Sequence, residues 1–190
     1  MPPDRMKIDP SAIAAPVDRY GYAWADARPA GVGVEIPAKA GTMIVAPEAG
    51  VVRAVWRAPD PPWEGFPPAG LVIRGGTTGL YHVIGGMDPK RWDYDRAGSQ
   101  GYYNPPSVGL SVNLGQGIGA AAGSGVVRWE VRRRLDVDAG DDPDAYAVDP
   151  IALLTRGEVG PFAAAPAASG GGIGILLLAV LAIVMLDGGK

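Results

Sequence analysis

The sequence predicts a mainly β domain that is followed by one apolar C-terminal helix. Short apolar runs alternate with Gly and Pro through most of the chain, and one uninterrupted apolar run stands near its end. The 190 residues include 29 Gly and 19 Pro, yet 47% of all residues are hydrophobic. This pattern is typical of strands joined by turns. A chain of this length can form one domain with a core and a short appendage.

Charge and rare residue types narrow the class of protein. The net charge is −3 and the pI is about 5.1, so the clustered basic surface of a nucleic-acid-binding protein is not expected. The chain has no cysteine, which excludes disulfides and thiolate metal sites. Its one imidazole is His82, whereas most zinc hydrolases need two or three. The one basic cluster, Arg128 with residues 132–134, is expected to be a solvated strand end.

Residues 1–25 are expected to form an extended N-terminal arm. They are rich in Pro and Ala, show weak periodicity, and lack the apolar stretch of a signal peptide. Tyr20, Tyr22 and Trp24 alternate, which predicts either a first strand or packing of the arm on the domain.

The β domain is expected over residues 26–156. Its apolar runs are short and bounded by Gly, Pro or Ala-Gly, as in an all-β domain. The expected strands are residues 32–36, 43–45, 51–56, 71–73, 80–84, 108–112 and 126–131. The acidic residues 136–144 are expected to form a solvated loop, because Gly140 comes one place early for a calcium loop and no closing Glu follows.

Two connections within the domain are long and aromatic. Residues 57–68 are rich in Pro and include Phe66, and residues 85–106 are rich in Gly and charged residues. Exposed aromatic side chains on such loops suit contacts with carbohydrate or protein, and the alternative is that the loops fold back over the sheet edge. The aromatic residues that could line a groove or contact a partner are Trp63, Trp92, Tyr94, Tyr102 and Tyr103.

A linker rich in Ala, Gly and Pro spans residues 157–170, and the expected transmembrane helix spans residues 171–187. Its strictly apolar part, Ile173–Leu186, has 14 residues, and the uncharged residues 169–172 extend it to 18, the lower limit for crossing a bilayer. A core helix is disfavoured because the run is apolar on every face. A hydrophobic plug inside an oligomer is the other alternative. The membrane-facing positions include Ile173, Leu177, Leu181 and Leu186.

Six sequence blocks follow one another in a particular order. After Asp26-Ala27-Arg28-Pro29 they read GVGVEIPAKAGTMIVAPEAGVVRAVW, LVIRGG, LYHVI, LGQGIGAAAGSG, VVRWEVRRR and VDPIALL. This ordered set resembles the lysostaphin-type (LytM-like) zinc endopeptidases, which cleave peptidoglycan. The resemblance covers residues 26–154 and implies that family's duplicated-hybrid-motif β-sandwich.

The family binds one zinc ion, and the resemblance places unsuitable residues at its ligand positions. The ligands are the His and Asp of the opening motif and the second His of a His-x-His strand. Gly31 stands at the opening His, Glu35 at the Asp, and Arg128 at the second His. A guanidinium repels Zn²⁺, and we expect it to pair with Glu35 instead.

The positions of the family's other histidines are also changed. Val126 stands at the catalytic base and Val83 at a further family histidine. His82 lies one residue from that position, which in a strand means the opposite face. Without zinc there is no activated water, so we expect a pseudoenzyme that has neither catalytic residues nor a cofactor. A serine hydrolase is disfavoured because no Gly-x-Ser-x-Gly motif occurs.

Two functions fit these expectations. In the first, the chain is a membrane-anchored structural or assembly component of a bacteriophage virion and contacts other virion proteins. In the second, it is a bacterial envelope module that binds peptidoglycan or activates a cell-wall amidase. An oligomeric assembly is expected in the first, since Gly170 to Gly172 and Gly174 permit close helix packing. The location of the protein distinguishes the two.

Overall fold

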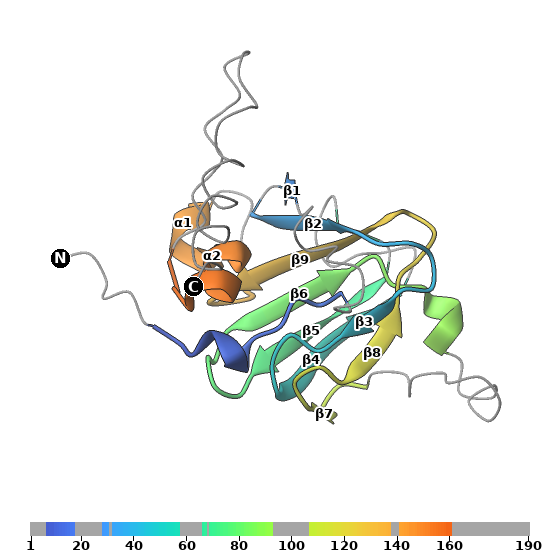
Figure 1. Cartoon of the computed structure of the whole chain (residues 1–190), viewed down its shortest axis with the longest axis horizontal. Helices are drawn as coiled ribbons and strands as arrows, with labels where there is room; N and C mark the ends of the chain where they lie inside the picture. The colour runs from blue at the N-terminus through green and yellow to red at the C-terminus, as the bar shows by residue number, and fades with distance from the viewer. Residues whose placement is uncertain are drawn as a thin grey trace, which may run out of the picture.

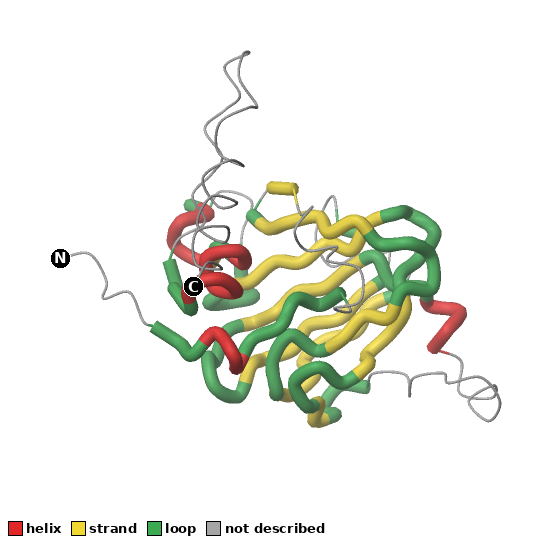
Figure 2. Tube along the Cα trace, in the orientation of Figure 1, coloured by secondary structure: helices red, strands yellow, loops and turns green. Residues whose placement is uncertain are grey.

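The computed structural model describes residues 7–17, 28–30, 32–57, 66–67, 69–92, 107–137 and 141–160. Strands dominate this part of the chain, and the few short helices lie at its margins (Figure 2). The expected mainly β fold is therefore confirmed. Residues 161–170 of the expected linker and the whole expected transmembrane helix lie outside the described residues, among which no helix is long and apolar enough to cross a membrane.

Eight of the described strands form one antiparallel sheet (Figure 1). Its order along the sheet is β1 (Arg28–Ala30), β2 (Gly33–Pro37), β9 (Val126–Arg132), β6 (Tyr81–Gly85), β5 (Gly70–Gly75), β4 (Gly50–Trp56) and β7 (Ser111–Val112), and β10 (Ala147–Val148) also pairs with β9. A separate two-stranded sheet joins β3 (Met43–Val45) to β8 (Gly117–Ala120). Helices α1 (Pro143–Tyr146) and α2 (Pro150–Arg156) lie at one end, and the 3-10 helices η1 (Pro10–Ala12) and η4 (Pro89–Trp92) lie outside the sheets.

The expected strands are found with small shifts, apart from residues 108–112. There the strand is limited to Ser111–Val112, because Gly109 adopts a positive φ of 91° in a turn. Val108 and Leu110 in this turn are 66% and 38% exposed. Strand β8 was not expected, since its Gly- and Ala-rich sequence has the composition of a turn.

The core lies between one face of the large sheet and the small sheet. Side chains that alternate inward from β2 and β9, such as Ile36 and Trp129, pack with Ile44 of β3 and Ile118 of β8. Leu153 of α2 closes the same core and is fully buried. Burial of this apolar surface is the main stabilising contribution of the fold.

The opposite face of the large sheet, called the outer face here, bears a second and smaller cluster. Trp56, Phe66, Val72 and Val83 are buried together, with Tyr81 packed against them. Phe66 belongs to the connection between β4 and β5, so this part of residues 57–68 folds back over the sheet, as one of the two alternatives predicts.

Residues 7–17 pack against the domain near its C-terminal helix. Ile8, Ile13 and Val17 are buried in the core, and Val45 donates a backbone hydrogen bond to Pro16. The N–H of Ile8 donates to the carbonyl of Gly157, which ends α2 in the left-handed conformation. The N-terminal segment therefore crosses the small sheet and meets the end of α2.

The acidic segment supplies a helix cap. Asp142 accepts a hydrogen bond from the N–H of Asp144 at the start of α1, and Asp149 caps α2 in the same way. Each helix has Pro at its first position, where the missing N–H is not needed. Asp141 is ion-paired with Arg134 at the surface.

Candidate functional site

Four of the five degenerate ligand or base positions lie on described strands and share the outer face. Glu35 is the direct Cα partner of Arg128, and Val126 is the partner of Pro37 in the same pair of strands. Val83 on β6 lies opposite Glu130 on β9. Gly31 lies outside the described residues. The sheet register thus brings together the positions that the resemblance singled out.

The expected ion pair between Glu35 and Arg128 is not found. Arg128 directs both Nε and Nη2 at one carboxylate oxygen of Glu130, at 3.1 and 2.9 Å. Glu35, although adjacent in register, makes no ion pair within the described part of the chain. Residues two apart on one strand share a face, so Glu130 competes with the cross-strand partner for the guanidinium.

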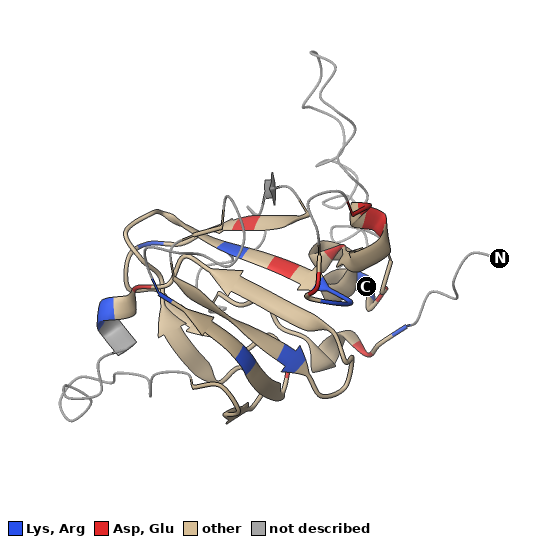
Figure 3. Cartoon of the chain, turned by 180° about the vertical axis from the view of Figure 1, so that it is seen from behind, with Lys and Arg blue, Asp and Glu red and all other residues tan. Residues whose placement is uncertain are grey.

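Glu130 is the centre of a buried ion network. Its side chain is 1% exposed, and its second carboxylate oxygen accepts hydrogen bonds from Nε and Nη2 of Arg132, which is 5% exposed. Arg132 also lies over the Tyr146 ring at 5.5 Å. Figure 3 shows acidic and basic positions alternating along this part of the sheet. The expectation of a solvated strand end is wrong for Arg128 and Arg132, because Glu130 and the aromatic rings cover them.

These residues do not fit a zinc ion. Zinc takes neutral imidazole, thiolate or carboxylate ligands. Among the positions described, Glu35 alone offers such a group, and the third position holds a permanent cation already bound to Glu130. No group of three His, Asp or Glu side chains suited to a metal occurs among the described residues.

His82 points into the core, as its place one residue from Val83 predicts. Its register partners are Ile73 and Val131, both core residues, and its ring stacks on Trp129 with centroids 6.1 Å apart. The ring is fully buried, so it cannot reach a substrate on either face.

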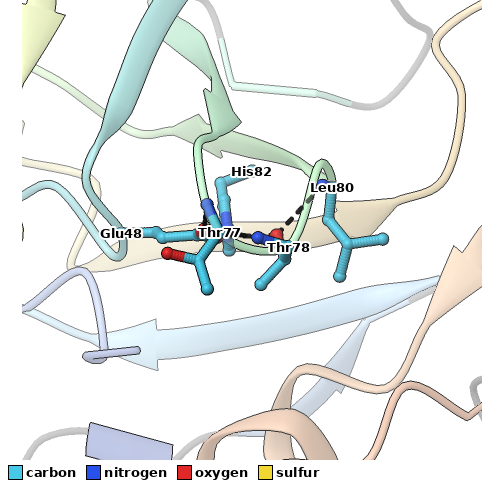
Figure 4. Close-up of polar contacts among 5 residues, drawn as sticks. All are labelled: Glu48, Thr77, Thr78, Leu80 and His82. Carbon is cyan, nitrogen blue, oxygen red and sulfur yellow. Dashed lines mark hydrogen bonds and ion pairs between the residues drawn. The ribbon is translucent and has the colours of Figure 1, made fainter. Parts of the chain in front are cut away.

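A buried carboxylate that the sequence did not single out binds His82 (Figure 4). Glu48 accepts hydrogen bonds from the N–H groups of Thr77 and Thr78 at 2.7 and 2.8 Å, and from the Thr78 hydroxyl at 2.7 Å. The His82 Nε2 lies 3.0 Å from Glu48. Because a carboxylate only accepts, Nε2 donates in this contact.

The network controls the protonation of Glu48. Burial by itself raises the pKa of the Glu48 carboxyl, but the hydrogen bonds from His82 and Thr78 outweigh burial and lower the pKa below its ordinary value. Glu48 precedes β4, and Thr77 and Thr78 lie in the turn between β5 and β6. The charged carboxylate therefore links the segment before β4 to the turn between β5 and β6, which is a structural role.

Most of the expected partner-binding aromatic residues cannot be placed. Trp63, Tyr94, Tyr102 and Tyr103 lie outside the described residues, and the backbone of Trp92 ends η4. The aromatic residues described on the outer face are instead Trp56, Phe66 and Tyr81. Alternation in β4 and β6 could have indicated Trp56 and Tyr81, but Phe66 has no such pattern around it.

Comparisons with known proteins give a resemblance of fold. No family model and no curated protein match the chain. Similar solved structures include lysostaphin, with 16% identity over 75% of this chain and a TM-score of 0.45. They also include a proposed M23 peptidase from Pseudomonas aeruginosa, with 17% identity over 80% of this chain and 53% of that chain and a TM-score of 0.47. Csd3 of Helicobacter pylori is similar as well, with 20% identity over 67% of this chain and 29% of that chain and a TM-score of 0.39.

One of these neighbours, lysostaphin, bears the name of the family that the ordered motifs resemble. The similar region spans about half of lysostaphin, 49% of its length. At these identities and TM-scores, the similarities alone establish neither an activity nor a ligand for the chain.

Proposed function

We propose that the chain is a catalytically inactive, peptidoglycan-endopeptidase-like protein that serves as a membrane-anchored structural component. One observation carries the proposal of inactivity. At the position of the third zinc ligand, the Arg128 guanidinium is held by the buried Glu130 carboxylate and lies 4.9 Å from the Phe66 ring centroid. A cation in this setting opposes the binding of a second cation.

Metal binding and wall cleavage test this inactivity together. The full chain, purified in detergent, is incubated with an equimolar amount of zinc, washed, and assayed for bound metal and for release of peptides from purified peptidoglycan. We expect neither stoichiometric zinc nor cleavage, whereas lysostaphin under the same conditions supplies the positive control. Stoichiometric zinc with release of wall peptides would overturn the proposal.

The apolar run Ile173–Leu186 supports membrane anchoring. Such a run, apolar on every face and preceded by a Gly-rich linker, suits a lipid environment. We place the protein in a bacteriophage virion, where a domain of this fold without its chemistry can act as a scaffold in an oligomeric assembly. Recovery of the protein with purified particles is the expected result.

A bacterial envelope module is the second candidate function. Tyr81 favours it, since this partly buried side chain of the outer face is of a residue type that stacks on sugars and anchors protein partners. Periplasmic recovery together with a cell-wall amidase, and absence from particles, would replace the virion role with this one.

A further inference from the structure

The turn before β7 carries the exposed large apolar side chains of the described residues. Val108 is 66% exposed and Leu110 is 38% exposed. The turn is held in one conformation, because the N–H of Leu110 donates a hydrogen bond of 3.0 Å to the carbonyl of Ser107 and Gly109 adopts a positive φ of 91°. Apolar groups that are already fixed on a surface lose little conformational entropy when a partner covers them.

Cations without an acidic partner stand next to this turn. The carbonyl of Leu110 accepts a hydrogen bond of 2.9 Å from the N–H of Val52, and the carbonyl of Val52 accepts one of 2.8 Å from Gly109. Arg53, the next residue on β4, is exposed, and so is Arg74 on the neighbouring strand β5. Neither guanidinium is ion-paired within the described part of the chain. Both positive charges are therefore available to an external anion.

An aromatic ring accompanies these cations. The guanidinium carbon of Arg74 lies 5.9 Å from the centroid of the Tyr81 ring, its register partner on β6. Arginine and tyrosine both combine an apolar body with a polar tip, which suits them to the boundary between a membrane and water. Figure 3 shows basic positions on neighbouring strands of the sheet and acidic positions gathered at α1.

We propose that a docking edge, made of Val108, Leu110, Arg53, Arg74 and Tyr81, lies on the headgroups of an anionic bilayer. The two apolar side chains enter the boundary between headgroups and acyl chains, and the two guanidinium groups bind the anionic groups of the lipids. The inference rests on the proposed membrane anchor and adds the orientation of the domain to it. These few contacts are too weak to hold the chain on a membrane without the anchor.

The place of the anchor favours a bilayer over a protein partner. Residues 161–172 separate Gly160 from the apolar run that begins at Ile173. A segment of this length spans at most about 40 Å. The anchor therefore presents the docking edge to the bilayer at high local concentration, so that a weak affinity is enough. The exposed carboxylates of Asp142 and Asp144 on α1 oppose the approach of that helix to anionic lipid.

Fluorescence quenching by lipid tests the docking edge. Because the chain has no cysteine, Val108→Cys allows a bimane fluorophore to be attached there alone, and Ala145→Cys, exposed on α1, is the matched control. Each full chain is reconstituted into phosphatidylcholine vesicles, with or without phosphatidylserine, that contain lipid spin-labelled near the headgroup. We expect quenching at position 108 that phosphatidylserine strengthens, and little quenching at position 145.

Neutralisation of the two arginines tests the role of charge. Arg53→Gln combined with Arg74→Gln should lower the ratio of docked to undocked domain by about 30-fold, which is the contribution of two basic residues at an anionic surface. The same quenching at position 108 measures this ratio in vesicles with phosphatidylserine. The variant should still float with the vesicles, because the anchor is unchanged.

Three results would overturn the docking edge. They are equal quenching at positions 108 and 145, quenching at position 108 that the arginine variant leaves unchanged, and a signal there that follows protein concentration instead of spin-labelled lipid. The last result would indicate contact with a second copy of the chain. Failure of the proposed anchor is distinguishable, since the chain would then not float with the vesicles, whereas a failed docking edge leaves flotation intact and removes the difference in quenching.

Discussion

Glu48 shows how one side chain can join distant parts of this fold. Its carboxylate is 1% exposed and accepts from Thr77, Thr78 and His82. Hydrogen bonds to a buried charge are worth more than neutral ones, but the gain exists only while the carboxylate is ionised. The folded-state pKa of Glu48 lies below its ordinary value, so this stability is present above about pH 4.5 and is lost as pH falls through the folded pKa.

Substitution of Glu48 by Gln should expose this pH dependence. At pH 7, Glu48→Gln is expected to lower the free energy of unfolding by about 1–3 kcal/mol, because a neutral amide replaces the charged acceptor. The difference from wild type should shrink as pH falls below about 4.5, where Glu48 of the unfolded chain takes up a proton, and should be smallest below the lower folded-state pKa. Denaturant unfolding at both pH values measures this, and an unchanged difference would contradict it.

Arg132 and Arg156 differ in surroundings although both make ion pairs. Arg132 is 5% exposed and holds the buried Glu130, whereas the Arg156 side chain is 59% exposed beside Glu158. Arg132→Ala should therefore destabilise the chain by about 3 kcal/mol, since it removes one of the two guanidinium partners of the buried Glu130 carboxylate. Arg156→Ala, the matched control, should cost less than about 1 kcal/mol. Equal losses in urea unfolding would show that Glu130 does not depend on Arg132.

At the scale of elements, the alternation of side chains along each strand explains which features of the fold could be predicted from the sequence. The periodicity of β6 and β9 correctly places His82 in the core and Arg128 on the outer face. The partners of Glu48 could not be foreseen, because Thr77 lies 29 residues away and the contact needs the folded connections. The burial of Arg132 was missed because Arg-x-Glu-x-Arg has the same spacing on a solvated strand as on a covered one.

The contact between the N-terminal segment and α2 depends on Gly157. Its φ is 64°, and a Cβ there would stand 1.8 Å from the Ile8 carbonyl oxygen. Gly157→Ala should destabilise the fold by more than about 1 kcal/mol, because strain and a backbone clash add together. Gly125 has a φ of 82°, but no atom lies within 4 Å of the place that a Cβ would take there. Gly125→Ala therefore measures the backbone strain alone. Similar losses for both variants in thermal unfolding would mean that Ile8 moves away readily.

At the scale of the whole molecule, the apolar C-terminal run is expected to determine where the domain resides. Leu177→Asp combined with Leu181→Asp should abolish flotation of the full chain with liposomes, since each carboxylate costs about 2.5–3.5 kcal/mol at a bilayer centre. Val108→Asp, a charge placed on the exposed turn of the domain, should leave flotation unchanged. Flotation of the double variant at the wild-type level would contradict membrane anchoring.

The contacts of Arg128 also limit which substitutions the outer face tolerates. Arg128→His would take one of two guanidinium partners from Glu130 and would remove the cation that lies beside the Phe66 ring. This variant is expected to be less stable than the parent chain. A change at position 128 therefore acts on two neighbours at once, so the ion pair with Glu130 and the contact with Phe66 constrain this position jointly.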